Sequence, residues 1–182
     1  MFAMRNNQTK GPEKIWRMRV SFDLDEVLFV SPEAHKTEAP LPFPWNLKYH
    51  ERLRYGTRKL INSLQDQGYE VRIYTSSFRT EKYIRRLFAH YGIVLDGIVN
   101  AQRHQREVQR ARKDRLPSKL PSYYRISLHV DDETVVATYG REYGFNVSQL
   151  NAQDDEWAEK IIKRAEEIRK LPPFEGRQTV EI

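Results

Sequence analysis

The chain has 182 residues, 39% of them apolar and 12% aromatic, and a formal net charge of +6; this favours a single domain with a sizeable core. It has no run of 18 or more apolar residues and no apolar N-terminal stretch of the signal-peptide type, which argues against a membrane partner. The absence of cysteine excludes disulfides and thiolate chemistry, so we expect a cytoplasmic protein.

Predicted strands and helices alternate along the chain. Their apolar periodicity and turn residues place them, in order, as a strand over 16–22, a proline-rich loop over 29–46, a helix from 57 to about 67, a strand over 70–75, a helix over 83–91, a strand over 94–99, a helix over 101–113, a strand over 125–130, a helix over 134–143, a strand over 145–147 and a helix over 157–168. This order predicts an α/β fold, a Rossmann-like three-layer sandwich with a mainly parallel sheet.

The composition also predicts three segments. Residues 1–14 are polar and predict a flexible N-terminal segment. Residues 15–170 contain all the predicted elements and form the domain. Residues 171–182 begin with Leu171-Pro172-Pro173 and predict an irregular C-terminal tail.

Three of the predicted strands end in acidic or hydroxyl residues. These are Asp23 and Asp25 after the strand over 16–22, Thr75 and Ser76 at the end of the strand over 70–75, and Asp131 and Asp132 after the strand over 125–130. The carboxyl ends of parallel strands meet at one edge of a sheet, where α/β proteins build their sites. The grouping predicts a bound divalent cation and a phosphate.

Each of these motifs has a functional and a structural interpretation. Neighbouring carboxylates can act as a nucleophile and as a general acid and base, hydroxyl and N–H groups before a helix can bind an anion, and Mg²⁺ prefers oxygen ligands. Equally, the first pair could cap a loop, and the other two pairs could cap the helices that follow them.

A lysine is expected at the same site, because a carboxylate nucleophile facing a phosphate dianion needs a positive charge nearby. Lys119 lies shortly before the strand over 125–130, and Lys113 is the competitor. We favour Lys119, since Leu120-Pro121 gives it a short and stiff approach to the strand. Either side chain could also be a solvated surface lysine.

Taken together, these motifs resemble those of the haloacid dehalogenase-like (HAD) phosphohydrolase superfamily. The resemblance spans residues 19–155 and depends on the order and spacing of Asp23-Leu24-Asp25-Glu26-Val27, Tyr74-Thr75-Ser76, a lysine and Val130-Asp131-Asp132. It implies a HAD-like catalytic domain at 15–170 with Mg²⁺ at the edge of the sheet. One departure is Glu26, where many members of the superfamily have glycine; it could alter the turn, adjust the proton affinity of Asp25 or face solvent.

The resemblance also implies a role for each residue. Asp23 would be the nucleophile that forms an aspartyl-phosphate, and Asp25 the general acid and base. Thr75, with Ser76, would hold the phosphoryl group, and Lys119 would neutralise Asp23 and the phosphate. The implied Mg²⁺ ligands are Asp23, Asp25 through its carbonyl, and Asp131 or Asp132, between which the resemblance does not choose.

The spacing of the motifs leaves no room for a large cap domain, so the site should admit a bulky phosphorylated substrate. Residues 103–119 contain seven Lys or Arg against two acids. On an α-helix Arg103, Arg106, Arg110 and Lys113 would share one face, where Arg106 and Arg110 could bind a phosphate backbone. A solvated helix face is the simpler interpretation of such a charge run.

Nearby aromatic side chains suggest base stacking. His104, Tyr123 and Tyr124 could stack on the bases of a nucleic acid. Trp45 in the loop over 29–46 could instead cover a small nucleotide, or the loop could pack on the domain surface. His129 lies in a predicted buried strand, where we expect a hydrogen-bonded core residue rather than a catalyst.

We therefore expect a Mg²⁺-dependent phosphatase, a hydrolase of phosphomonoesters, acting on a nucleotide or on the phosphate end of a nucleic acid. The alternative is a non-catalytic HAD-fold module that binds nucleic acid or protein through the basic 103–119 segment.

Overall fold

The computed structural model describes residues 17–110, 116–151 and 153–171. The predicted N-terminal segment at 1–14, Lys113, and the tail after Leu171 lie outside the described residues.

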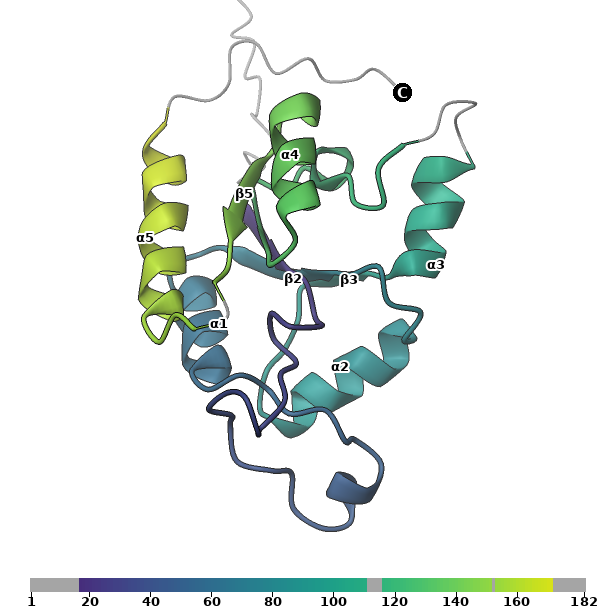
Figure 1. Ribbon diagram of the computed structural model, residues 1–182, viewed down its shortest axis with the longest axis vertical. Coiled ribbons are helices and arrows are strands. Elements are labelled where there is room, and N and C mark those ends of the chain that lie inside the picture. Colours follow the sequence, from purple (N-terminus) through teal and green to yellow (C-terminus); the bar gives the residue numbers. More distant parts are fainter. Residues whose placement is uncertain (1–16, 111–115, 152, 172–182) are drawn as a thin grey trace, which may run out of the picture.

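Five parallel strands form a single sheet in the order β3-β2-β1-β4-β5 (Figure 1). They are β1 (Arg19–Phe22), β2 (Glu70–Tyr74), β3 (Gly97–Val99), β4 (Leu128–Asp131) and β5 (Asn146–Gln149). In the centre of the sheet, Val20 of β1 aligns with Val71 on one side and Leu128 on the other. The residues that follow β1, β2 and β4 therefore meet at one edge, and the α/β fold expected from the sequence is confirmed.

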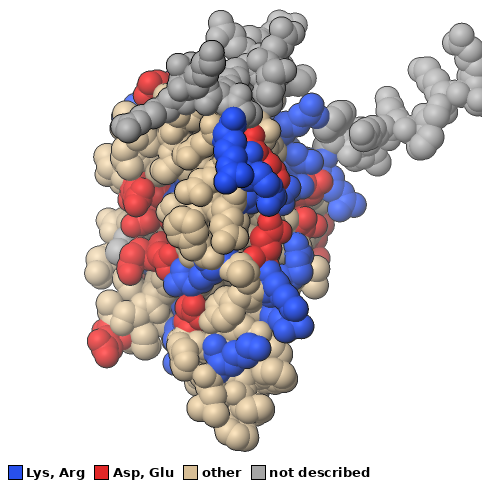
Figure 2. Space-filling model, turned by 90° about the vertical axis from the view of Figure 1, so that its right-hand side faces the viewer, with Lys and Arg blue, Asp and Glu red and all other residues tan. Residues whose placement is uncertain are grey.

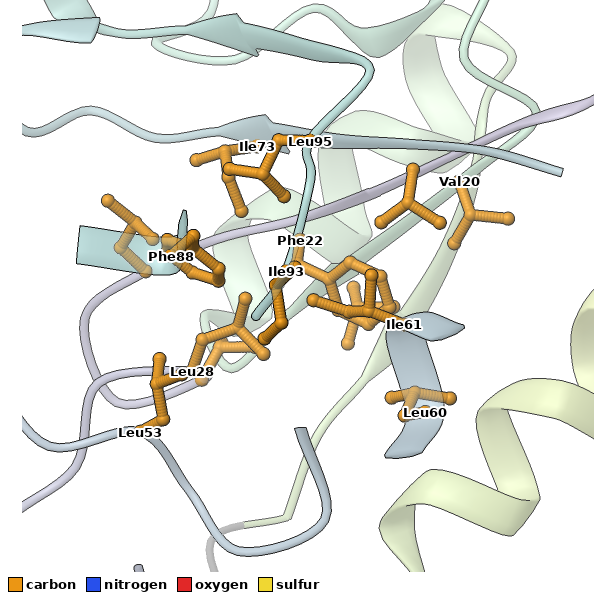
Figure 3. Packing of buried hydrophobic residues seen from close by; sticks show 14 of the residues in the cluster. Val20, Phe22, Leu28, Leu53, Leu60, Ile61, Ile73, Phe88, Ile93 and Leu95 are labelled. Carbon is orange, nitrogen blue, oxygen red and sulfur yellow. The ribbon is translucent and has the colours of Figure 1, made fainter. Parts of the chain in front are cut away.

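One face of the sheet is covered by α1 (Thr57–Asp66), α2 (Glu81–His90) and α5 (Trp157–Lys170). Alternation along β1 directs Val20 and Phe22 to this face, where they pack with Ile61 of α1 and Phe88 of α2 (Figure 3). This larger core cluster fixes the strands that carry the acidic residues.

The other face is covered by α3 (Ala101–His104), η2 (Gln105–Gln109), η3 (Pro121–Tyr124) and α4 (Thr134–Tyr143), and Figure 1 shows α3 and α4 on the opposite side of the sheet from α1 and α2. Tyr74, Val99 and Val136 belong to the core of this face. The same alternation points Ser21 and His129 into it, and both are fully buried. This second layer is therefore partly polar next to the sheet.

The helix predicted over 101–113 differs in the structure. Four α-helical residues are followed by a π-helical turn, η2, in which Arg110 N donates to Gln105 O. A π turn pairs residues five apart, so it changes which side chains share a face. The regular α-helical spacing, on which the expected common face of Arg103, Arg106 and Arg110 depends, therefore ends at His104.

The proline-rich segment between β1 and α1 packs on α2. Its short helix η1 (Trp45–Leu47) places the Trp45 ring on His90, with ring centroids 4.3 Å apart, and Tyr49 lies 5.1 Å from Tyr83. Trp45 thus packs on the domain surface. Within the described ranges no insertion builds a separate cap domain. None of the helices described there combines the length and apolar character that crossing a bilayer requires.

Candidate active site

Lys119 lies between two carboxylates at the edge of the sheet. Its Nζ is 2.9 Å from Asp23 Oδ2, just after β1, and 2.6 Å from Asp131 Oδ2, at the end of β4. Lys119 is 1% exposed and Asp131 is fully buried. The sequence therefore correctly placed a lysine at this edge, and the structure brings Lys119 there.

The charges within this group support one another. Burial alone would lower the pKa of Lys119, but Asp23 and Asp131 outweigh it and raise that pKa. Burial would raise the pKa of Asp131, but His129 and Lys119 lower it to about 2. Lys119 is therefore an ammonium and Asp131 a carboxylate.

His129 supports Asp131 from behind. Its Nε2 lies 2.9 Å from Asp131 Oδ2, and its Nδ1 lies 2.8 Å from Ser21 Oγ. Because Asp131 is ionised, Nε2 is the donor in the first contact. The ring is fully buried, so the expectation of a hydrogen-bonded core histidine is confirmed.

Three carboxylates form a group that fits a cation. Single oxygens of Asp23, Asp131 and Asp132 all lie within 4.8 Å of one another. With Lys119 the group carries a net charge of about −2 in its ionised form. Burial, together with the charges of Asp131 and Asp23, raises the pKa of Asp132, which is what crowded carboxylates show when their charge is not balanced.

One carboxylate oxygen in this group lacks a hydrogen-bond partner within the part of the chain that the structure describes. Asp23 Oδ1 is buried and has no hydrogen-bond partner among the described residues. A buried carboxylate oxygen without a partner is costly unless something else, such as a cation, binds it. The donor set, all oxygens, matches the preference of Mg²⁺.

Thr75 and Ser76 follow β2 beside this group. Thr75 is buried, its N–H donates to Val99 O, and its Oγ1 accepts from Ser77 N at 3.1 Å. The residue that caps α2 is Thr80, whose Oγ1 accepts from Tyr83 N, so the interpretation of the Thr75-Ser76 pair as the helix cap is wrong. Ser76 is exposed.

Asp25 lies apart from the three carboxylates. Its side chain is 54% exposed and pairs with Arg79 Nη1 at 2.9 Å, while Arg79 Nε pairs with Glu51 at 2.9 Å. Arg79 also donates to Ser77 Oγ. Arg79 could not be found from the sequence, because an arginine between a strand and a helix carries no pattern that marks it.

Glu26 adopts the backbone conformation that favours glycine, with φ of +58°. Arg54 lies beneath this turn, buried, and donates to the carbonyl oxygens of Glu26 and Val27, each at 2.9 Å. The turn that follows Asp25 is thus kept without glycine. Arg54 is a second residue that the sequence did not reveal.

The basic segment is only partly free to bind a partner. Arg103 contacts Glu107 and Ile98 O, and Arg106 contacts Glu107 at 3.2 Å while remaining 64% exposed. Arg110 is exposed. Figure 2, which views the side where α2 and α3 lie in Figure 1, shows basic and acidic side chains interleaved.

Two of the aromatic side chains proposed for base stacking are unavailable. His104 is 3% exposed and Tyr124 is 8% exposed, so neither presents a ring face to a ligand. Both pack around Tyr74 instead. That part of the expectation is wrong.

Comparison with protein-family models finds no match to this chain, and comparison with curated proteins finds none either. Among the solved structures with a similar fold are the following two. An uncharacterized protein from Listeria monocytogenes serotype 4b shares 14% identity with a TM-score of 0.52, over 85% of this chain and 99% of the other. A HAD-superfamily hydrolase, subfamily IA, variant 1, from Geobacter sulfurreducens PCA shares 14% identity with a TM-score of 0.51, over 82% of this chain and 100% of the other. This chain therefore has a HAD-like fold.

Proposed function

We propose that this protein is a Mg²⁺-dependent phosphatase that hydrolyses phosphomonoesters through an aspartyl-phosphate on Asp23. The observation that carries the proposal is the difference between the two carboxylate oxygens of Asp23. Lys119 holds one carboxylate oxygen, Oδ2, and the other, Oδ1, is buried and without a partner among the described residues. A carboxylate whose second oxygen has no partner keeps the lone pairs of that oxygen available to a phosphorus atom and to a cation.

The other residues have distinct tasks in this proposal. Lys119 offsets the negative charge that Asp23 and a phosphate dianion bring together. Thr75 and the backbone that follows it hold the phosphoryl oxygens. Asp25 protonates the leaving oxygen and then takes a proton from the water that hydrolyses the aspartyl-phosphate. In the structure Asp25 pairs with Arg79, so it must leave or share this contact to reach the substrate.

The structure favours Asp132 over Asp131 as the direct metal ligand. Both oxygens of Asp131 already accept hydrogen bonds, Oδ2 from Lys119 and His129 and Oδ1 from Glu133 N. Asp131 is thus best suited to anchor Lys119. Mg²⁺ would be held by Asp23, Asp132 and the carbonyl of Asp25, and when bound it would neutralise carboxylate and phosphate charge.

For the substrate we propose a nucleotide or the phosphate end of a nucleic acid. In the described part of the chain no cap domain covers the edge of the sheet, so the size of the group attached to the phosphate is little restricted. Arg106 and Arg110 are the exposed arginines of the 103–119 segment that the structure describes. They are the residues we propose to contact a polymer backbone.

The test is phosphate release from an aryl phosphate, mononucleotides and oligonucleotides with a 5′- or 3′-phosphate, with Mg²⁺ and with EDTA. Asp23→Asn should retain the fold, measured by circular dichroism, and lose turnover. Full activity in that variant would contradict the mechanism. Release from an oligonucleotide that weakens with salt, and weakens further in the Arg106→Ala/Arg110→Ala variant, would support the polymer substrate.

The binding-module alternative makes a different prediction. It expects salt-sensitive oligonucleotide binding that survives Asp23→Asn but not the double arginine substitution, together with no phosphate release from any substrate. A module of this kind has no need for a buried carboxylate with an unpaired oxygen, so the hydrogen bonding of Asp23 favours the enzyme.

A further inference from the structure

The segment that carries Lys119 is irregular, yet the Lys119 ammonium must reach two carboxylates. Residues 116–120 form no helix or strand. Pro117 and Leu120 flank Lys119 and are buried with it. The backbone on both sides of the lysine must therefore be held by something other than secondary structure.

Two buried side chains hold it. Leu120 N donates to Tyr74 OH at 2.7 Å, and Tyr74 OH lies 2.6 Å from His104 Nδ1. On the far side of the ring, His104 Nε2 lies 3.1 Å from Pro117 O. The chain of hydrogen bonds thus leaves the segment just after Lys119 and returns to it two residues before.

The chemistry of the groups fixes the direction of every hydrogen bond. Pro117 O can only accept, so His104 Nε2 carries the proton and donates. A neutral ring then leaves Nδ1 as an acceptor, and Tyr74 donates to it while accepting from Leu120 N. Burial lowers the pKa of His104 and raises that of Tyr74, which keeps both groups neutral in this arrangement.

The two side chains are themselves firmly placed. Tyr74 is the last residue of β2, next to Thr75, and its ring is fully buried against Tyr124 at 5.5 Å. His104 is the last residue of α3, with 3% exposure. They connect the sheet and α3 to an irregular segment at the point where the lysine needs support.

We propose that Tyr74 and His104 are positioning residues that clamp the 117–120 segment and so set the Lys119 ammonium between Asp23 and Asp131. The role of Lys119 in turnover depends on the proposed function, but the clamp itself does not. Loss of the clamp should let the segment move, expose the amine and misplace the positive charge beside the nucleophile.

The first test reads the position of Lys119 without any activity. The purified protein is treated with acetic anhydride, and the acetylation rate of each lysine is measured by peptide mass spectrometry, with the exposed Lys82 as internal reference. Lys119 should react slowly in the wild type and at least about tenfold faster in Tyr74→Phe, because a lysine that is 1% exposed reacts only when its segment opens.

Two controls separate positioning from general loss of stability. Tyr69→Phe removes another buried hydroxyl, one without a hydrogen-bond partner among the described residues. Val136→Ala weakens the core cluster to which Tyr74 belongs and removes none of the hydrogen bonds of the clamp. Both should leave the relative reactivity of Lys119 at its wild-type value. His104→Phe should act like Tyr74→Phe, and the double variant should add little, because both substitutions break one chain of hydrogen bonds.

The second test uses turnover. In Tyr74→Phe, kcat should fall by about tenfold or more, while KM for an aryl phosphate changes less, since a small displacement of a catalytic group costs rate. Val136→Ala should keep its kcat at a temperature where it is fully folded.

The outcomes are distinguishable. Wild-type Lys119 reactivity in Tyr74→Phe, with a loss of stability like that of Val136→Ala, would overturn the clamp. Faster acetylation in a protein whose wild type releases no phosphate would support the clamp and contradict the proposed function.

Discussion

Replacing Lys119 with methionine tests the charge balance of the site most directly. Methionine has nearly the length and volume of the lysine stem, so the substitution removes the ammonium with little change in packing. In the wild type the ammonium contacts Asp23 at 2.9 Å and Asp131 at 2.6 Å, and all three side chains are almost fully buried. The variant would keep two buried carboxylates without their cation.

The expected cost follows from that geometry. Removing one partner of a buried ion pair leaves an uncompensated charge and costs about 3–5 kcal/mol. For a chain of this size each kcal/mol lowers the melting temperature by about 2–4 °C, so we expect a fall of roughly 6–20 °C in EDTA. His129 still donates to Asp131, which places the result toward the lower end.

The assay is thermal unfolding followed by circular dichroism, in EDTA and with added Mg²⁺. Mg²⁺ should recover more stability in Lys119→Met than in the wild type, because a cation bound to the folded state offsets the lost ammonium. Lys160→Met is the control, since Lys160 is 58% exposed in its pair with Asp154; it should leave the melting temperature unchanged. A Lys119→Met protein as stable as the wild type in EDTA would refute the charge balance described above.

Three further substitutions test other parts of the site. Asp132→Asn should raise the Mg²⁺ concentration for half-maximal phosphate release by about tenfold or more, because the Asp132 carboxylate is proposed to bind the ion directly. An unchanged dependence on Mg²⁺ concentration would exclude that role. Glu26→Gly should raise the free energy of unfolding in urea by about 0.5–1 kcal/mol. Glycine relieves the left-handed strain at φ of +58°, although its greater freedom in the unfolded chain offsets part of that gain. A lower free energy of unfolding would show that the contacts of the glutamate side chain outweigh the backbone strain. Arg79→Lys should lower kcat several-fold with a small change in melting temperature, because the planar guanidinium contacts Asp25 and Glu51 through two separate nitrogens, a geometry that a single ammonium does not reproduce. Wild-type kinetics in this variant would show that the bridge is dispensable.

The sequence was sufficient to predict the fold, and it also predicted which residues lie at one edge of the sheet, for a physical reason. Strands that are buried on both faces leave long apolar runs, and the polar residues just after them must meet at the sheet edge. That rule predicts the three strand-end pairs, Asp23 with Asp25, Thr75 with Ser76, and Asp131 with Asp132, and the structure brings Asp23, Asp131 and Asp132 together. Lys119 needed one further observation, the stiff Leu120-Pro121 approach, and the structure confirms its place.

What the sequence could not show are contacts between distant segments. Arg54 and Arg79 look like ordinary surface arginines, and only the folded chain places them against the turn after Asp25 and against Asp25 itself. The prediction for the basic segment 103–119 was incomplete for a related reason. A regular α-helix is predicted there, but the structure has a π turn after His104, and His104 itself is buried. Local periodicity carries no information about either feature.

The packing of the proline-rich segment on α2 has a consequence for selectivity. Trp45 rests on His90, Tyr49 on Tyr83, and Glu51 reaches Arg79, which in turn holds Asp25. The segment beside Asp25, the proposed general acid and base, thus packs against α2 instead of standing free over the site. In the proposed phosphatase, this packed segment would supply no closing step through which to reject a wrong substrate or to delay the departure of product. Discrimination by the phosphatase must then come from contacts outside the cleavage point, and unrelated small phosphate esters should differ little in their rate of hydrolysis.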